Sequence, residues 1–110
     1  MSKHLKCCVQ PKLATLRNLY DGPHDSEHVR QCTSCGASWF QRWHEEVSFD
    51  GGADSSTDWY TRLTDVERDG LVAAVGRPDL AFLGLGKRPA ICVDEHGVRE
   101  VVGAPGNPRS

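Results

Sequence analysis

The fold of this chain depends on one stretch, Arg30-Gln31-Cys32-Thr33-Ser34-Cys35-Gly36-Ala37-Ser38-Trp39-Phe40. Two cysteines are separated by two residues, a glycine follows the second, and aromatic residues come next. This spacing lets both thiolates bind one tetrahedral metal ion at about 2.3 Å each. Gly36 gives the backbone the freedom to turn beneath the metal. The stretch therefore predicts a zinc knuckle that leads into a strand.

A tetrahedral structural site needs four protein ligands, and the N-terminal residues supply the candidates for the other two. Cys7 and Cys8 would complete an all-cysteine site, although adjacent residues point to opposite sides of an extended chain. His4 and Cys7 repeat the spacing of Cys32 and Cys35, which makes His4 an alternative ligand. We predict a Zn²⁺ site formed by Cys7, Cys8, Cys32 and Cys35, with His4 as the substitute.

Composition indicates a small cytoplasmic domain. The chain has 110 residues, five cysteines and a formal net charge of −2. It contains neither a signal-like apolar segment nor an apolar run long enough to span a membrane, so we expect no membrane partner. In a reducing cytoplasm, clustered cysteines bind metals more often than they form disulfides. We expect one zinc-stapled domain over residues 1–102 and a disordered tail over 103–110.

The residues after the knuckle predict a β-hairpin. Apolar and polar residues alternate over 38–49, which places Trp39 and Trp43 on one face of a half-buried strand. Residues 50–57 form a glycine-rich acidic loop, and 58–63 return as a second strand that carries Trp59. We expect the three tryptophans to be cross-strand neighbours in this hairpin.

The remaining segments complete an α+β, mostly β fold. Residues 13–20 have leucines at helical spacing, yet their place between two cysteine clusters favours a strand. Thr64 and Glu67 form a capping-box pattern at the start of one short helix over about 64–75, which Gly76 ends. Its candidates for burial are Val66, Leu71, Ala74 and Val75. Residues 78–83 can add a helical turn, and 89–93 with 98–102 predict a C-terminal hairpin.

The segment from Cys7-Cys8 to Leu63 resembles zinc-ribbon proteins. It is similar to small bacterial proteins that carry a Cys-x-x-Cys-Gly-x-x-Trp knuckle followed by an acidic hairpin. The resemblance covers about half of the chain and implies a zinc-stapled antiparallel sheet. It implies no particular activity.

A site closed by four protein ligands has a structural role, because no coordination position is left for water or substrate. The sequence also lacks a recognisable acid, base and nucleophile, so we expect a non-enzymatic protein-interaction module. A protein partner, with a toxin as one candidate, suits the weakly acidic charge. The alternatives are a nucleic-acid-binding ribbon, which this charge disfavours, and a thiol redox protein that uses Cys32 and Cys35.

Overall fold

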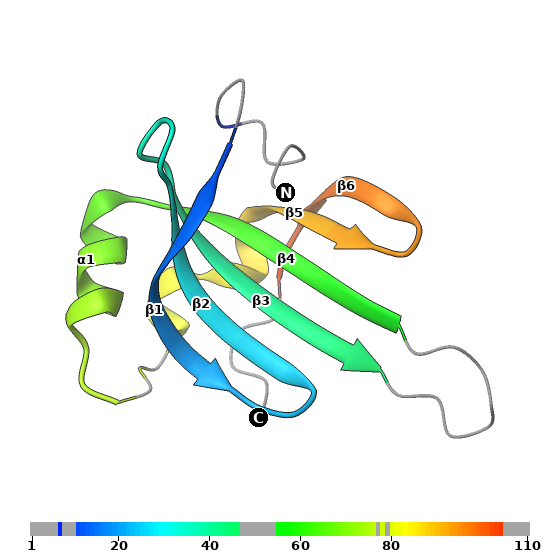
Figure 1. Cartoon of the computed structure of the whole chain (residues 1–110), viewed down its shortest axis with the longest axis horizontal. Helices are drawn as coiled ribbons and strands as arrows, with labels where there is room; N and C mark the ends of the chain where they lie inside the picture. Colours follow the sequence, from blue (N-terminus) through cyan, green and yellow to red (C-terminus); the bar gives the residue numbers. More distant parts are fainter. Residues whose placement is uncertain (1–6, 8–10, 47–54, 77, 79, 105–110) are drawn as a thin grey trace.

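The chain folds into one six-stranded antiparallel sheet in which every strand pairs with its neighbours in the sequence (Figure 1). The computed structural model describes residues 7, 11–46, 55–76, 78 and 80–104. The strands are β1 (Leu13–Asp21), β2 (Asp25–Cys32), β3 (Ser38–Glu46), β4 (Ser55–Leu63), β5 (Pro89–Asp94) and β6 (Gly97–Val102). One α-helix, α1 (Asp65–Ala73), and two 3₁₀ turns, η2 (Ala81–Leu83) and η3 (Leu85–Lys87), connect β4 to β5. The mostly β, α+β architecture is therefore confirmed.

The segment with leucines at helical spacing is a strand, as predicted. β1 pairs along its length with β2, from Leu13 opposite Cys32 to Asp21 opposite Ser26. Irregularities in this pairing interrupt the alternation of side chains. As a result, the Leu19 side chain is buried in the core, and the pairing of β1 with β2 resumes at Tyr20.

The helix begins where the sequence predicts. Thr64 accepts a hydrogen bond from the backbone N–H of Glu67 at 3.2 Å, and the Glu67 carboxylate accepts one from the backbone N–H of Thr64 at 2.9 Å. The helix ends at Ala73, earlier than expected. Of its candidates for burial, Leu71 is fully enclosed, whereas Val66 and Val75 are 82% and 98% exposed.

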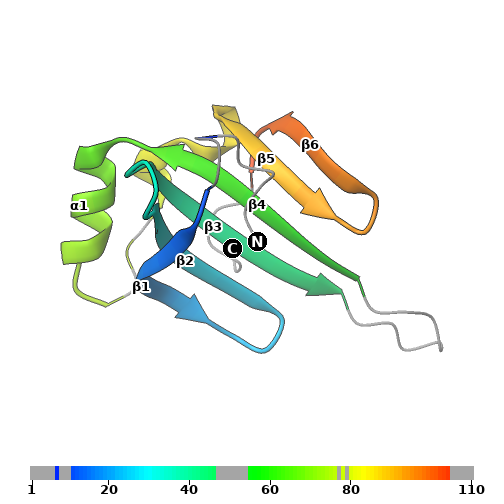
Figure 2. The same ribbon diagram turned by 45° about the horizontal axis from the view of Figure 1, so that its top comes forward.

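The sheet has a hydrophobic cluster on each face. The larger one joins β1–β4 to α1 and the 3₁₀ segment, which pack against one face of the sheet (Figure 2). It consists of Leu19, Val29, Phe40, Leu63, Leu71, Leu80, Leu83 and Leu85. The smaller cluster lies on the other face and consists of Cys32, Ala37, Trp39 and Tyr60, with Cys7, Leu13, Ile91 and Val93 packed against it. It is this second cluster that surrounds the predicted metal ligands.

The predicted grouping of the three tryptophans is wrong. In the β3–β4 register, Trp59 lies opposite Arg42, whereas Trp43 lies opposite Asp58. Because successive residues point to opposite faces, Trp59 is on the face opposite Trp39 and Trp43. The expectation of a half-buried β3 also fails at Trp39 and Phe40, since both side chains are buried, one on each face.

The loop and tail predictions fall partly on described residues. Ser55–Thr57, expected in the acidic loop, belong to β4, and residues 47–54 lie outside the described part of the chain. The C-terminal hairpin forms as predicted, as β5 and β6. After it, the N–H of Gly103 donates to Arg88 O at 2.9 Å and that of Ala104 to Leu85 O at 3.0 Å. Residues 105–110 lie outside the described part.

Within the described residues, the structure contains no helix with the length and apolar character needed to cross a membrane.

Candidate metal centre

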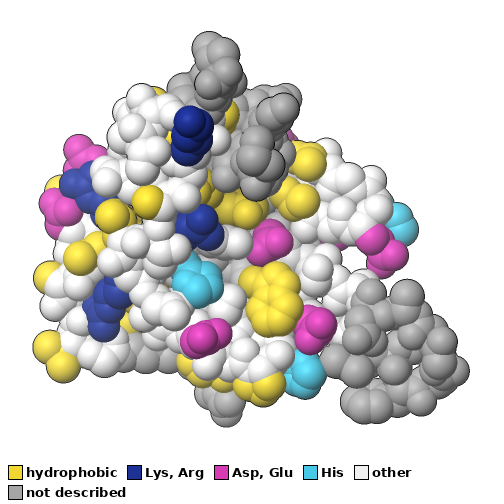
Figure 3. Space-filling view, viewed as in Figure 1, with side chains coloured by type: hydrophobic (Ala, Val, Ile, Leu, Met, Phe, Trp, Pro, Cys, Tyr) yellow, Lys and Arg dark blue, Asp and Glu magenta, His cyan; other side chains and the backbone are white. Residues whose placement is uncertain are grey.

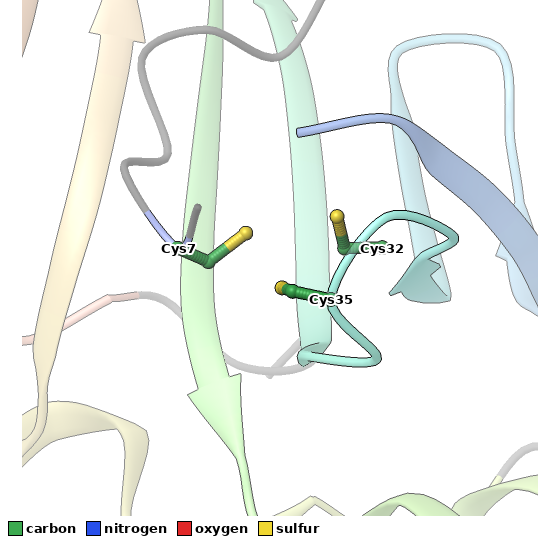
Figure 4. A group of neighbouring side chains, drawn as sticks. All are labelled: Cys7, Cys32 and Cys35. Carbon is green, nitrogen blue, oxygen red and sulfur yellow. The ribbon is translucent and has the colours of Figure 1, made fainter. Parts of the chain in front are cut away.

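Three cysteines from two separate parts of the sequence meet at one end of the sheet (Figure 4). The Sγ atoms of Cys7, Cys32 and Cys35 all lie within 4.8 Å of one another. A tetrahedral zinc ion with Zn–S bonds of about 2.3 Å would separate its sulfur ligands by about 3.8 Å. Figure 4 shows the Cys7 side chain directed toward the turn that carries the other two. This arrangement could hold a metal ion.

The turn after β2 places Cys32 and Cys35 together. The N–H of Cys32 donates to Ala37 O at 2.7 Å, and the N–H of Gly36 donates back to Cys32 O at 2.8 Å. Gly36 has φ = +84°, a left-handed conformation that residues with a side chain rarely adopt. The backbone freedom predicted for this glycine is therefore used in the turn.

Hydrogen bonds connect Lys12, just before β1, to this turn. The N–H of Thr33 donates to Lys12 O at 2.7 Å. In the other direction, the N–H of Lys12 donates to the Cys32 sulfur at 3.4 Å. Hydrogen bonds from backbone N–H groups stabilise the thiolate form of a cysteine, so the hydrogen bond from Lys12 also prepares Cys32 for metal binding.

The thiols of the cluster differ in acidity. Burial by itself raises the pKa of Cys32, but N–H donors from Lys12, Cys35 and Ser34 outweigh this effect and lower the pKa to about 6. Burial raises the pKa of Cys7 to about 12, and hydrogen bonds with the Cys35 and Cys32 sulfurs add to the increase. One thiolate is thus formed near neutral pH, and its negative charge disfavours a second one. A cation that binds all three sulfurs would remove this conflict.

The structure describes only some of the predicted ligands. Cys7, Cys32 and Cys35 come together, whereas Cys8 and His4 lie outside the described residues. Cys92 is buried on β5, on the face opposite this cluster.

The described histidines lie in other places. His24 Nδ1 is 3.3 Å from Glu45 Oε1, and His44 Nδ1 is 2.7 Å from Asp25 Oδ1. Both pairs are at the opposite end of β2 and β3 from the cysteines, as the register shows. His28 lies 3.1 Å from Ser26 Oγ. These residues do not replace a thiolate ligand.

Local sequence patterns did not predict the pair of buried charges on β2 and β3. Glu27 has no exposed surface, and Arg42 is almost fully buried. Their proximity depends on the β2–β3 register, in which Glu27 is opposite Arg42. Only the alternation along β3, which places Arg42 on the Phe40 face, could have suggested an inward-facing charge.

A comparison with protein-family models, curated proteins and solved structures found no match. The resemblance to zinc ribbons therefore rests on the residues of the knuckle alone.

Proposed function

We propose that this chain is a zinc-binding, non-enzymatic protein-interaction module whose metal has a structural role. The observation that supports this function is the meeting of Cys7, Cys32 and Cys35, with all Sγ atoms within 4.8 Å. Thiolates select zinc and other thiophilic metals over the hard cations that oxygen ligands prefer. The Cys-x-x-Cys spacing and the positive φ of Gly36 suit a tetrahedral site.

The fourth ligand is proposed to be Cys8, with His4 as the alternative. Either residue would close the site with protein atoms, so that no coordination position remains for a substrate or for an activated water. The metal would then contribute to folding, because its ligands are not organised in the unfolded chain.

The proposed zinc site would fasten the N-terminal segment over the smaller hydrophobic cluster. Cys7 packs against the group that contains Trp39 and Tyr60. A metal bond between Cys7 and the turn after β2 would keep this apolar surface covered. We therefore expect metal removal to lower the stability of the whole sheet and not only that of the turn.

A thiol redox function has one supporting observation, the lowered pKa of Cys32. Redox pairs of the Cys-x-x-Cys type place the first cysteine at a helix N-terminus. Here Cys32 ends a strand, and a turn leads from it to β3. Structural zinc also gives a role to the third cysteine, Cys7, which a two-cysteine redox pair would leave unused.

Metal content and thermal stability test the proposal. Untagged protein is analysed by inductively coupled plasma mass spectrometry, and its thermal midpoint is measured with and without a strong chelator. We expect one zinc per chain and a lower midpoint after chelation. Cys35→Ser should lose the metal, whereas Cys92→Ala, which removes a cysteine distant from the cluster, should keep it. Metal-free protein with an unchanged midpoint would refute the proposal.

The same assay identifies the fourth ligand. Cys8→Ser and His4→Gln are compared for zinc content in the presence of a competing chelator. Loss of zinc in the first variant alone supports an all-cysteine site, and loss in the second alone supports three cysteines and one histidine.

A further inference from the structure

One row of side chains crosses four strands on the sheet face that carries the smaller cluster. In register, Trp43 of β3 lies opposite Asp58 of β4, Asp58 opposite Val93 of β5, and Val93 opposite Val98 of β6. Directly opposed residues point to the same face and lie about 5 Å apart. We call these four residues the Trp43 row. The helix and the 3₁₀ turns pack on the other face of the sheet (Figure 2).

The Trp43 row combines apolar surface with a central carboxylate. Trp43, Asp58 and Val93 are partly exposed, and Val98 is 51% exposed. The carboxylate of Asp58 accepts a hydrogen bond from Gln41 Nε2 at 2.9 Å, which fixes its orientation. Aromatic residues are enriched in the sites where proteins bind one another, and a carboxylate of fixed orientation beside one can pair with a cation of the partner.

The electrostatic surroundings of the row are acidic. Glu45 lies two residues from Trp43 on the same face of β3, and Glu100 is exposed on the same face of β6. Figure 3 shows acidic, histidine and hydrophobic side chains over β3, β4 and the β5–β6 hairpin, and a Lys or Arg side chain beside the central histidine on the same face. The row therefore lies in a negative region.

Among the described residues, the arginines of this face lie toward the cysteine end. The Arg30 guanidinium donates to Gln41 Oε1 at 2.6 Å, and the Arg62 guanidinium is 5.7 Å from the centroid of the Trp39 ring. The β2–β3 and β3–β4 registers place both arginines opposite Trp39, away from Trp43. The charge of Asp58 also acts on its neighbour Tyr60, whose pKa is raised to about 12 by burial and then by this carboxylate.

We propose that the Trp43 row binds a partner protein through a Lys or Arg side chain flanked by apolar side chains. The partner's cation would contact the Asp58 carboxylate and the face of the Trp43 indole, an arrangement that favours cations electrostatically. Its apolar neighbours would cover Val93 and Val98. This inference rests on the proposed function as an interaction module and names the chemistry of its partner. A phosphate backbone would be repelled by the same carboxylates.

Defined peptides test the proposal without knowledge of the natural partner. The probes are acetyl-Val-Arg-Val-Arg-Val-amide, its Glu-for-Arg counterpart and its Gly-for-Val counterpart, each titrated into isotope-labelled, metal-replete protein and followed by two-dimensional NMR. We expect saturable shifts at Trp43, Asp58 and Val98 with the first peptide, weaker binding of the glycine peptide, and no binding of the glutamate peptide.

Matched variants locate the binding site. Asp58→Asn keeps an acceptor for Gln41 and removes the charge, so the dissociation constant for the arginine peptide should rise about fivefold or more. Asp65→Asn removes an 84% exposed carboxylate on α1 and should leave it unchanged. Val98→Thr, at an exposed strand position, provides a second variant if Asp58→Asn does not fold. It should weaken the arginine peptide more than the glycine peptide.

Other results overturn the inference. Equal binding of the arginine and glutamate peptides, shifts centred on α1, or equal effects of Asp58→Asn and Asp65→Asn would each exclude the Trp43 row. Binding of a single-stranded oligonucleotide at the row, in place of the peptide, would also exclude it. Zinc content is measured on the same samples. If metal-free protein still binds the arginine peptide selectively, only the structural zinc is refuted. Zinc-bound protein without peptide selectivity refutes only the Trp43 row.

Discussion

Arg42 Nη1 lies 3.6 Å from Glu27 Oε2, and the Glu27 side chain has no exposure to solvent. The same guanidinium donates from Nη2 to Asp25 Oδ1 at 2.9 Å. A buried charge needs a counter-charge, because its transfer out of water is strongly unfavourable. Arg42 therefore makes it possible for β2 to place a carboxylate inside the fold.

Removal of this counter-charge should be strongly destabilising. We expect Arg42→Met to lower the free energy of unfolding by about 3–5 kcal/mol, since the Glu27 carboxylate would remain buried without its cation. The double variant Glu27→Leu/Arg42→Met should recover part of this loss, because it removes both charges. Urea denaturation of the wild type, of Arg42→Met, of Glu27→Leu and of the double variant provides the measurement. An Arg42→Met protein within about 1 kcal/mol of the wild type would contradict the assignment.

Substitution by alanine should change the stability of the protein in opposite directions at two glycines that have open space around them. Neither Gly36 nor Gly70 has a neighbouring atom within 4 Å of the position where a Cβ would lie, so backbone conformation decides the outcome. Gly36→Ala should destabilise by about 1–2 kcal/mol, since its φ of +84° strains an L-residue. Gly70→Ala, inside α1, should stabilise by about 0.5–1 kcal/mol.

Thermal midpoints of the two alanine variants, together with zinc affinity from chelator competition, test this pair. The Gly36 variant should also bind zinc more weakly, because the strain lies within the proposed site. Equal midpoints for the two variants would refute the argument from backbone conformation.

Glu67 should make stability depend on pH. Burial raises its pKa, but the Arg88 guanidinium, with contacts of 2.8 and 3.1 Å, and the hydrogen bond from Thr64 outweigh this and lower the pKa below its usual 4.5. A lowered pKa in the folded state contributes stability that is present above pH 4.5. This contribution is lost as the pH falls through the folded-state value.

The comparison of Glu67→Gln with the wild type measures this contribution. We expect the variant to be less stable by about 1–2 kcal/mol at pH 7, and the difference should shrink below pH 4.5. Asp69→Asn, at a side chain that is 70% exposed, should change stability by less than about 1 kcal/mol. A difference for Glu67→Gln that is constant from pH 7 to pH 3 would contradict the role of its charge.

Arg17 should hold the end of α1 against β1. Its Nη1 donates to Leu71 O at 2.7 Å and to Ala74 O, and its Nη2 donates to Gly76 O at 2.7 Å. A cation at a helix C-terminus satisfies carbonyl groups that have no partner within the helix. We expect Arg17→Ala to lower the free energy of unfolding by about 1–2 kcal/mol.

Hydrogen exchange provides the more specific measurement for Arg17. Amides in the last turn of α1 should exchange faster in Arg17→Ala, while those of β3 stay protected. Arg99→Ala removes a half-exposed arginine paired with Asp94 at 2.9 Å and should have no such effect. Unchanged exchange in α1 would contradict the proposed capping role.

Local sequence signals predicted the elements of this fold well. The capping pair Thr64 and Glu67 located the start of α1, and the apolar segments on either side of Asp94–Gly97 located the last hairpin. For residues 13–20, spacing favoured a helix, but position between the cysteine clusters correctly favoured a strand. Capping patterns and hydrophobic periodicity involve residues that are close in the sequence. They can therefore be recognised in a single sequence.

Register and long-range polar contacts could not be predicted in the same way. Trp59 and Trp43 lie on opposite faces because of the β3–β4 register, and a shift of one residue reverses every side chain of a strand. The Arg17 contacts join residues more than 50 positions apart. For the metal centre, spacing identified Cys7, Cys32 and Cys35 as candidate ligands, and the structure brings these three together. The choice between Cys8 and His4 stays a prediction.

The order of the strands has a consequence for how the chain is synthesised and folded. From β2 onward, each strand pairs with the strand that precedes it in the sequence. Each new strand therefore finds its partner already synthesised. Pairing of nearby segments closes short loops and favours rapid folding. The first four strands are complete at Leu63, before the helix and the last hairpin are made. The sheet can therefore grow from β1 toward β6 in the direction of translation, and all three clustered cysteines have been made once the turn after β2 is complete.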